Sequence, residues 1–437
     1  MHKKIFSPEK LAKVFLGIFL FIFPLQIQVL LFSEVQHFTG VFQPFTSFFF
    51  YAADLCLMVS LMFFSWRFIK KKTETIFEFG SMYVTGLLVF FVLMLILHTF
   101  FFAEHKVLAL LISLRFLELL GLYFLVINRV LSFMQIFRFL AWGIGFQVLV
   151  GLFQYIFQGS LGLSFLGEPI LGKNVANVAK VDLNGDKILR AYGTFPHPNI
   201  FGGAAFFALV ITFTRLKNNF YVWLPWLILF GFGLLISFSR SAFVAVIAFI
   251  IFYFALSNFK VRARKVLIVG TLLLSLAIIF NVPNVLMQRF NPRNDSALLS
   301  RIENLEISKS MLLANPLGVG LGNYTDKMQN YTLARLEPWD FQPVHNIFLL
   351  VTNEIGVLGG LVYASLFFVS LVLLFRYLRL RRGRPKHHAL ILISLGFGMM
   401  IIGLFDHYFF TLFPGQVLWI LYFALVSGFL DDEAVFK

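Results

Sequence analysis

Long runs of apolar residues separated by short polar segments make up most of the chain. A helix that crosses the apolar part of a membrane needs about 20 residues, whereas membrane-spanning strands show alternating runs of about 10. The runs therefore predict an all-α, polytopic membrane helix bundle over residues 1–437, with about twelve transmembrane helices. The predicted spans are Leu11 to Phe32, Phe45 to Trp66, Met82 to Phe102, Val107 to Ile127, Leu131 to Phe157, Asn199 to Phe213, Tyr221 to Phe238, Ala242 to Leu256, Val266 to Phe280, Ile347 to Phe375, Ala389 to Leu404 and Leu412 to Leu430.

Two longer polar regions interrupt the spans, and both are predicted on the outer side of the membrane. In the first, residues 158–198, the segment from Lys180 to Arg190 alternates polar and apolar residues around Asn184-Gly185. An Asn-Gly pair between alternating residues predicts a β-hairpin. Asp182, Asn184 and Asp186 also resemble the start of a calcium loop, but the glycine is misplaced and the bidentate glutamate is missing.

The second region, residues 282–344, contains a predicted amphipathic helix that lies on the bundle and stops at Asn315-Pro316. Its apolar stripe is predicted to consist of Leu298, Ile302, Leu305, Met311 and Leu312. The stretch from Gly318 to Gly322 lacks the lysine of a phosphate loop and is interpreted as a tight glycine turn, whose backbone amides would still suit a phosphate.

Composition excludes a soluble fold, because 59% of the residues are hydrophobic, 60 are Phe and the mean hydropathy is +0.85. The net charge of +15 comes mainly from predicted inner loops, whereas residues 282–344 hold six basic and six acidic residues. Lys and Arg are retained in cytoplasmic loops, so this distribution predicts an even number of spans with both termini cytoplasmic. The net positive charge is therefore explained by the basic residues of the inner loops, and nucleic acid is not an expected partner.

Few polar groups are expected inside the membrane. The single cysteine, Cys56, lies in a predicted span, which leaves neither a disulfide nor a cysteine metal site. Arg115 and Glu118 are three residues apart on one predicted helix and are expected to form an ion pair that Asp54 joins. The alternative for such charges is a proton or ion path.

Arginine and histidine residues mark the predicted outer edge of the bundle. Arg240 lies between Ser239 and Ser241 at the joint of a hydrophobic hairpin, where it either snorkels to the interface or binds a ligand. His197 follows Pro196 in an irregular turn and either bonds the loop backbone or serves a site. His345 precedes a span. It either caps that helix or acts as a reactive base.

Several short motifs occur in order along the central and C-terminal parts of the chain. They are Arg190 with Gly193-Thr194-Phe195 and Pro198-Asn199, then Ser239-Arg240-Ser241, Ser300-Arg301, Asn315-Pro316-Leu317-Gly318-Val319-Gly320, and His345-Asn346 with Glu354 and Gly356. Together they resemble the O-antigen ligase and O-antigen polymerase superfamily of membrane glycosyltransferases. Asp406-His407-Tyr408 is similar to a pattern in some members.

The resemblance implies an enzyme that takes a glycan from an undecaprenyl-pyrophosphate carrier and transfers it to an acceptor hydroxyl, at the outer face of the cytoplasmic membrane. It implies no cofactor and no metal. His345 is the expected catalytic base, and Arg240, Arg301 and, more weakly, Arg190 are expected to bind pyrophosphate. Possible supporting residues are His197, Asn346, Glu354, Ser239 and His407.

The expected partners are the carrier-linked glycan donor, a lipid- or glycan-linked acceptor and membrane lipids. The acceptor stays open among lipid A core, a growing polymer and a protein. The alternative function is a flippase or transporter of lipid-linked oligosaccharide without glycosyl transfer. It predicts internal repeats with broken helices in both halves, and the sequence shows no such repeat.

Overall fold

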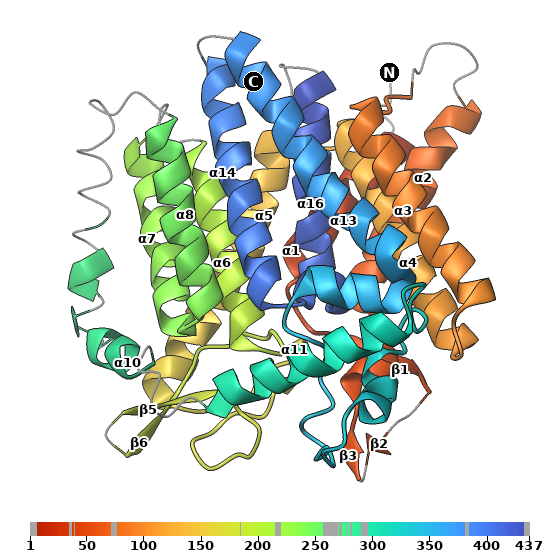
Figure 1. The fold of residues 1–437 in the computed structure, drawn as a ribbon. Helices are drawn as coiled ribbons and strands as arrows, with labels where there is room; N and C mark the ends of the chain where they lie inside the picture. The colour runs from red at the N-terminus through yellow and green to blue at the C-terminus, as the bar shows by residue number, and fades with distance from the viewer. Residues whose placement is uncertain are drawn as a thin grey trace.

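Long helices run side by side, and most connections with secondary structure of their own gather at one end of the bundle (Figure 1). The structure, a computed structural model, describes residues 7–34, 37–38, 40–70, 77–183, 185–214, 220–256, 270, 273–276, 278–279, 282–289, 296–380 and 384–431. The helices of the bundle are α1 (Pro8–Ile22), α2 (Ala52–Lys70), α3 (Met82–Phe101), α4 (Lys106–Ile127), α5 (Phe133–Phe157), α6 (Pro198–Phe213), α7 (Phe220–Ser237), α8 (Arg240–Ala255), α13 (Ile347–Leu380), α14 (Arg384–Phe405) and α16 (Phe413–Asp431).

The crowded end, called the loop end below, carries the strands and the short helices. These are β1 (Gln28–Ser33), β2 (His37–Phe38), β3 (Val41–Phe42), η1 (Pro44–Thr46), β4 (Ser47–Tyr51), η2 (Ser164–Leu166), β5 (Lys180–Leu183), β6 (Asp186–Leu189), α10 (Val282–Arg289), α11 (Ser296–Ala314), α12 (Tyr324–Lys327), η5 (Met328–Tyr331) and α15 (Tyr408–Thr411). The start of α1 and the end of α16 lie at the opposite end (Figure 1). That shared end agrees with an even number of crossings, and the side of the membrane it faces stays a prediction.

Among the described residues, seven helices are long and apolar enough to cross a membrane: α3, α4, α5, α7, α13, α14 and α16. The apolar helices α6 and α8 are shorter. The protein is thus a predominantly helical, multi-pass membrane protein, as predicted. The count of twelve stays a prediction, because most of the span predicted at residues 266–280 falls outside the described residues.

The first predicted span was wrong over about half its length, and the second over about a third. Helix α1 ends at Ile22, and β1 then pairs in antiparallel fashion with β4, with Gln28 opposite Tyr51. Pro24 lacks the backbone N–H that would continue the helical hydrogen bonds, so the helix stops before it. An apolar run does not by itself distinguish a strand from a helix, which is why the sequence pattern missed this pair.

The hairpin predicted between Lys180 and Arg190 is confirmed. Strands β5 and β6 pair from Lys180 opposite Leu189 to Leu183 opposite Asp186. Gly185 has φ +93°, which a glycine adopts without strain. The carboxylate of Asp182 accepts a hydrogen bond from the Gly185 backbone at 2.9 Å, so it closes the turn. Asn184 lies outside the described residues.

The predicted outer helix is present as α11, but the predicted apolar stripe was partly wrong. Ile302 and Leu305 are exposed. The buried face consists of Asn304, Ile307, Ser308 and Met311. This face includes a polar contact with α13, where the Asn353 amide donates to the Ser308 hydroxyl at 2.7 Å. The spacing of apolar residues does not predict such a contact.

The predicted glycine turn packs against a break in α13. Ile355 and Gly356 leave helical geometry, with φ 76° at Gly356, and the carbonyls of Asn353 and Glu354 lose their helical partners. The backbone N–H groups of Val319 and Gly320 donate to those two carbonyls at 2.8 and 3.0 Å. These amides therefore satisfy the broken helix, and they are not directed at a phosphate.

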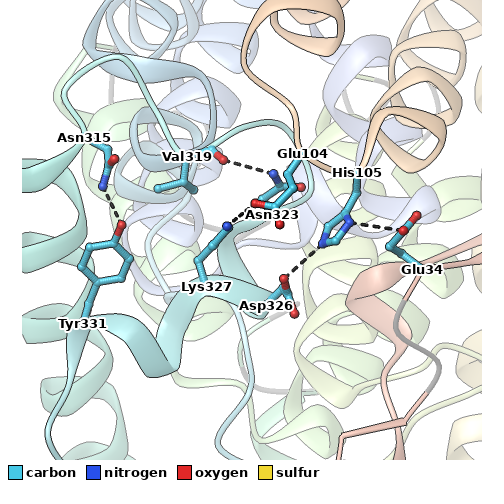
Figure 2. A network of polar contacts seen from close by, with 9 residues as sticks. All are labelled: Glu34, Glu104, His105, Asn315, Val319, Asn323, Asp326, Lys327 and Tyr331. Carbon is cyan, nitrogen blue, oxygen red and sulfur yellow. Dashed lines mark hydrogen bonds and ion pairs between the residues drawn. The ribbon is translucent and has the colours of Figure 1, made fainter.

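A polar network at the loop end ties the segment around α12 to the α3–α4 turn and to β1 (Figure 2). The His105 imidazole lies 3.3 Å from a carboxylate oxygen of Glu34 and 3.1 Å from one of Asp326. Lys327 forms an ion pair with Glu104. Because α12 has only four residues, these contacts fix its position.

The predicted intramembrane ion pair is confirmed. The Arg115 guanidinium pairs with Asp54 and lies 3.5 Å from Glu118. It also donates to the Phe49 carbonyl at 2.9 Å, and its carbon lies 4.6 Å from the centre of the Phe413 ring. The side chains of Arg115 and Asp54 are buried, so each charge depends on the other.

We expect Asp54→Asn to lower the free energy of unfolding by about 3–5 kcal/mol, since it leaves a buried guanidinium without its main counter-charge. The measurement is reversible unfolding in detergent micelles. Glu9→Gln is the control, because it breaks the half-exposed Arg67–Glu9 pair at 3.6 Å and should cost less than about 1 kcal/mol. Equal losses in the two variants would contradict this assignment.

Candidate active site

The Arg190 side chain links four segments at the loop end. It is 3% exposed and follows β6 directly. Its Nε donates to the Ser237 carbonyl at the end of α7 at 2.8 Å, and a terminal nitrogen donates to the Asn199 side chain in α6 at 2.6 Å. The Asn199 amide in turn donates to Asp406, after α14, at 2.7 Å. These contacts place Arg190 beneath the site as a support, and its predicted role as a phosphate ligand stays a prediction.

Two buried glutamines of α5 hold the turn between Arg190 and α6. The Gln154 side-chain oxygen accepts from the backbone N–H groups of Tyr192 and Gly193 at 3.1 and 2.9 Å. The Gln147 oxygen accepts from the backbone N–H of Thr194 at 2.6 Å. Neither glutamine was predicted as a site residue, although amides inside an apolar span are a signal of such a role.

Three histidines from distant parts of the chain meet beside this support. The His345 and His407 rings pack edge to face with centroids 5.2 Å apart. His197, which starts α6, is close enough for both of them to affect its pKa. His345 lies just before α13, and His407 lies between α14 and α15. The structure thus brings together three histidines that the sequence treated separately.

The three imidazoles differ in what they bond. Nδ1 of His197 accepts from the Asn199 backbone at 3.1 Å, which caps α6. Nδ1 of His407 shares a hydrogen bond of 2.7 Å with the Thr411 hydroxyl. Nδ1 of His345 is buried and has no hydrogen-bond partner in the part of the chain that the structure describes. Of the three Nδ1 atoms, that of His345 is therefore the one left without a hydrogen bond to the described residues.

Asn346 removes the alternative interpretation of His345 as a helix cap. Its side-chain oxygen accepts from the backbone N–H groups of Phe348 and Leu349, both at 3.1 Å. This is the bonding pattern of an N-cap residue. Asn346 therefore holds the start of α13 and sets the position from which the neighbouring His345 enters the site.

Burial lowers the pKa of His345, the Asp406 carboxylate opposes that change by raising it, and the Arg301 charge lowers it further. Burial also lowers the pKa of His197 and of His407 well below the usual value, with neighbouring charges that include Arg301 adding to the effect. Removing an imidazole from water disfavours its charged form. At neutral pH all three rings are therefore uncharged.

Arg301 is the cation that acts on all three imidazoles. It lies on α11, whose buried residues Ile307 and Met311 hold that helix against the protein. Its side chain is partly exposed. A guanidinium whose charge acts on all three imidazoles suits an anionic ligand at this end.

Arg240 begins α8 at the same end, one residue after Ser239. The joint is tight: Phe238 has φ 47°, a strained value for a residue with a side chain, and a Cβ on Gly202 would meet the Ser237 hydroxyl at 2.6 Å. Ser237 is also the residue whose carbonyl binds Arg190. The backbone thus connects Arg240 to the support under the histidines, and the Ser239 hydroxyl, 3.2 Å from that of Ser241, stays within the joint.

A cavity of about 330 Å³ borders the histidines. We call it the aromatic cavity and define it by Phe45, Phe48, Phe413, Gln28, Arg115 and Glu354. The Phe45 ring packs against His407 with centroids 5.4 Å apart, and Thr411, the partner of His407, also lines the cavity. Glu354 lines the cavity as well. The cavity was not predicted from the sequence, because residues 45–51 were expected to be part of a membrane helix.

The comparison with protein families supports the resemblance found in the sequence. A family model described as O-antigen ligase matches residues 225–364, the segment that carries Arg240, Arg301, His345 and Glu354. No curated protein matches the chain.

The electrostatics generate a prediction that does not depend on activity. We expect the pKa of His345 to lie below 6.5, and Asp406→Asn to lower it further because the carboxylate that favours the imidazolium is lost. NMR of the protein labelled in its histidine rings, with His345→Gln to assign the signal, measures both values. Asp326→Asn is the control, since it changes the surroundings of His105 and should leave the His345 titration unchanged. A His345 pKa above 6.5, or one that rises in Asp406→Asn, would refute the assignment.

Proposed function

We propose that this protein, whose residues 225–364 match a family model described as O-antigen ligase, is a membrane glycosyltransferase. Its donor is a glycan on undecaprenyl pyrophosphate, and its acceptor is a hydroxyl at the outer face of the cytoplasmic membrane. The observation that carries the proposal is the neutral His345 ring, with an unbonded buried nitrogen, next to the Arg301 cation at the polar end of an apolar bundle.

The pyrophosphate group binds between Arg240 and Arg301. The polyprenyl chain stays in the lipid beside the bundle, so the pyrophosphate lies at the membrane edge, at the level of the loop end. Guanidinium groups bind phosphate oxygens through paired hydrogen bonds, and they stabilise the negative charge that grows as the sugar departs. Arg190, whose nitrogens bond Ser237 and Asn199, positions the joint before Arg240 and does not need to touch the phosphate.

His345 accepts the proton of the acceptor hydroxyl. As the acceptor oxygen attacks the anomeric carbon, the bond from that carbon to the pyrophosphate oxygen breaks, and undecaprenyl pyrophosphate leaves with the electron pair. The proton stays on His345 until solvent removes it. A lowered pKa keeps the ring unprotonated at neutral pH, which is the form a base requires.

Asp406 stabilises the imidazolium that this step creates. Its charge favours the protonated form of His345, and its own position is fixed by the Asn199 amide. The backbone N–H of His407 also donates to Asp406 at 3.1 Å. The chain of contacts from Arg190 through Asn199 to Asp406 thus sets the electrostatics around the base.

The acceptor is a lipid A core, a carrier-linked growing polymer or a protein, and these share one donor site. The flippase alternative needs neither a base nor a leaving-group clamp. An assay that follows the glycosidic bond separates the two functions, because a flippase moves the intact lipid-linked glycan without making a bond.

We expect His345→Ala to lower glycosyl transfer by about 10²–10⁴-fold, the usual contribution of a general base. Arg240→Ala and Arg301→Ala should each lower it by about 10²–10³-fold, since each removes a donor to the developing charge. The measurement is incubation of purified protein with the undecaprenyl-pyrophosphate glycan and separate candidate acceptors.

Arg335→Ala is the matched control for these variants, because Arg335 is an exposed arginine of the same loop and should leave transfer unchanged. Full transfer by His345→Ala would reject the assignment of the base. Movement of the donor across a bilayer by the native protein, with no glycosidic bond formed, would replace the proposal with the flippase.

A further inference from the structure

The aromatic cavity is not explained by the chemistry of the base and the pyrophosphate clamp. Its volume of about 330 Å³ falls at the lower end of the range for small-molecule sites, about 300–1,000 Å³. Its walls combine phenylalanine rings with the amide of Gln28, the carboxylate of Glu354 and the guanidinium of Arg115. An acyl chain would leave these polar groups without partners.

The charges around the cavity disfavour an anionic ligand. Among its lining residues, Arg115 is the one basic side chain. Arg115 already pairs with Asp54 and lies beside Glu118. Its guanidinium therefore has no surplus positive charge for a phosphate.

The walls suit a ligand with one apolar face and several hydroxyl groups. Tyr51 and Phe413 stack with ring centroids 4.4 Å apart, and both line the cavity. The C–H face of a pyranose packs on such rings, while its hydroxyls bond amides and carboxylates. Glu354 has one carboxylate oxygen on the Gly322 backbone at 3.0 Å, which fixes the side chain at the cavity wall.

The cavity also lies near the three histidines of the candidate site. Pro196 and Pro343, which line it, lie one residue before His197 and two residues before His345. Thr411, which lines it as well, is hydrogen-bonded to His407. The cavity therefore lies close to the imidazoles.

The wall formed by Gly322 and Thr325 is held in place from outside. Thr325 precedes Asp326 and Lys327, which the network of Figure 2 attaches to His105 and Glu104. Thr325 is 3% exposed. The cavity thus has a fixed shape before a ligand enters, which lowers the entropic cost of binding.

We infer that the aromatic cavity is a saccharide subsite, which holds one neutral sugar ring of the substrate beside His345 and His407. The inference rests on the proposed function for the identity of the substrate, and the ring belongs either to the donor glycan or to the acceptor. The ring packs on the phenylalanine side chains, and Glu354 and Gln28 bond its hydroxyls.

The inference is tested with substitutions that fill the cavity with a larger side chain. Thr325→Trp places an indole inside it, and Gln28→Trp fills it from the exposed strand β1, where folding tolerates the change better. Leu333→Trp adds the same side chain at an exposed position of the same loop and is the control. The probes are the carrier-linked glycan from the producing cells, and the free oligosaccharide that mild acid releases from it.

We expect both cavity variants to weaken binding of the free oligosaccharide, or to raise KM for the acceptor, by about tenfold or more, with Leu333→Trp like the native protein. Weaker oligosaccharide binding together with a raised KM for the carrier-linked glycan assigns the ring to the donor. A raised KM for the acceptor alone assigns it to the acceptor. Native binding and native KM values in both folded cavity variants would overturn the subsite.

The binding measurement separates this inference from the proposed function. If the native protein forms no glycosidic bond but binds the oligosaccharide in a manner that Thr325→Trp and Gln28→Trp weaken, the subsite stands and the transferase proposal fails. If transfer proceeds and neither binding nor KM depends on the cavity, the transferase proposal stands and the subsite fails.

Discussion

The Arg190 guanidinium is the contact on which the loop end of the bundle depends. A buried cation is tolerated only when hydrogen bonds and counter-charges surround it. Arg190 meets this requirement with the Ser237 carbonyl and Asn199, and Asn199 extends the link to Asp406. The ends of α7 and α14 and the start of α6 are thereby brought to one place. The positions of Arg240, His197 and His407 follow from this link.

Several charged groups at this end hold the protein together. Arg115 and Arg190 have their partners inside the protein. Burial keeps His345 neutral while Asp406 restores part of its basicity. At the break in α13, backbone N–H groups of the turn before α12 bond the carbonyls of Asn353 and Glu354. The Glu354 side chain lines the cavity from this backbone. Both the support and the reactive groups are needed for the proposed chemistry.

The sequence predicted the fold best where length and apolar content suffice. The bounds of α3, α4, α5, α6 and α16 lie within about two residues of the predicted spans. The β1–β4 pair was missed because its strands are apolar on both faces, and pairing across 23 residues leaves no local signal. The orientation of α11 was partly wrong because its buried face includes a polar contact with Asn353, which the apolar spacing does not encode.

The candidate site was predicted only in part, because a sequence shows local motifs and does not show tertiary contacts. Arg240, Arg301 and His345 stand in short motifs, so the sequence alone makes them candidates. The association of Asp406 with Asn199, and of Phe413 with Arg115, is a tertiary contact between residues hundreds of positions apart. No local pattern encodes such a contact, and neither the support beneath the histidines nor the aromatic cavity was predictable.

The most direct test of the account is a structure by electron cryomicroscopy of the protein in a lipid nanodisc with the undecaprenyl-pyrophosphate glycan bound. The account predicts the pyrophosphate between Arg240 and Arg301, with the anomeric carbon facing His345. A pyrophosphate bound at the opposite end of the bundle, or at the loop end with His345 turned away from the sugar, would contradict it.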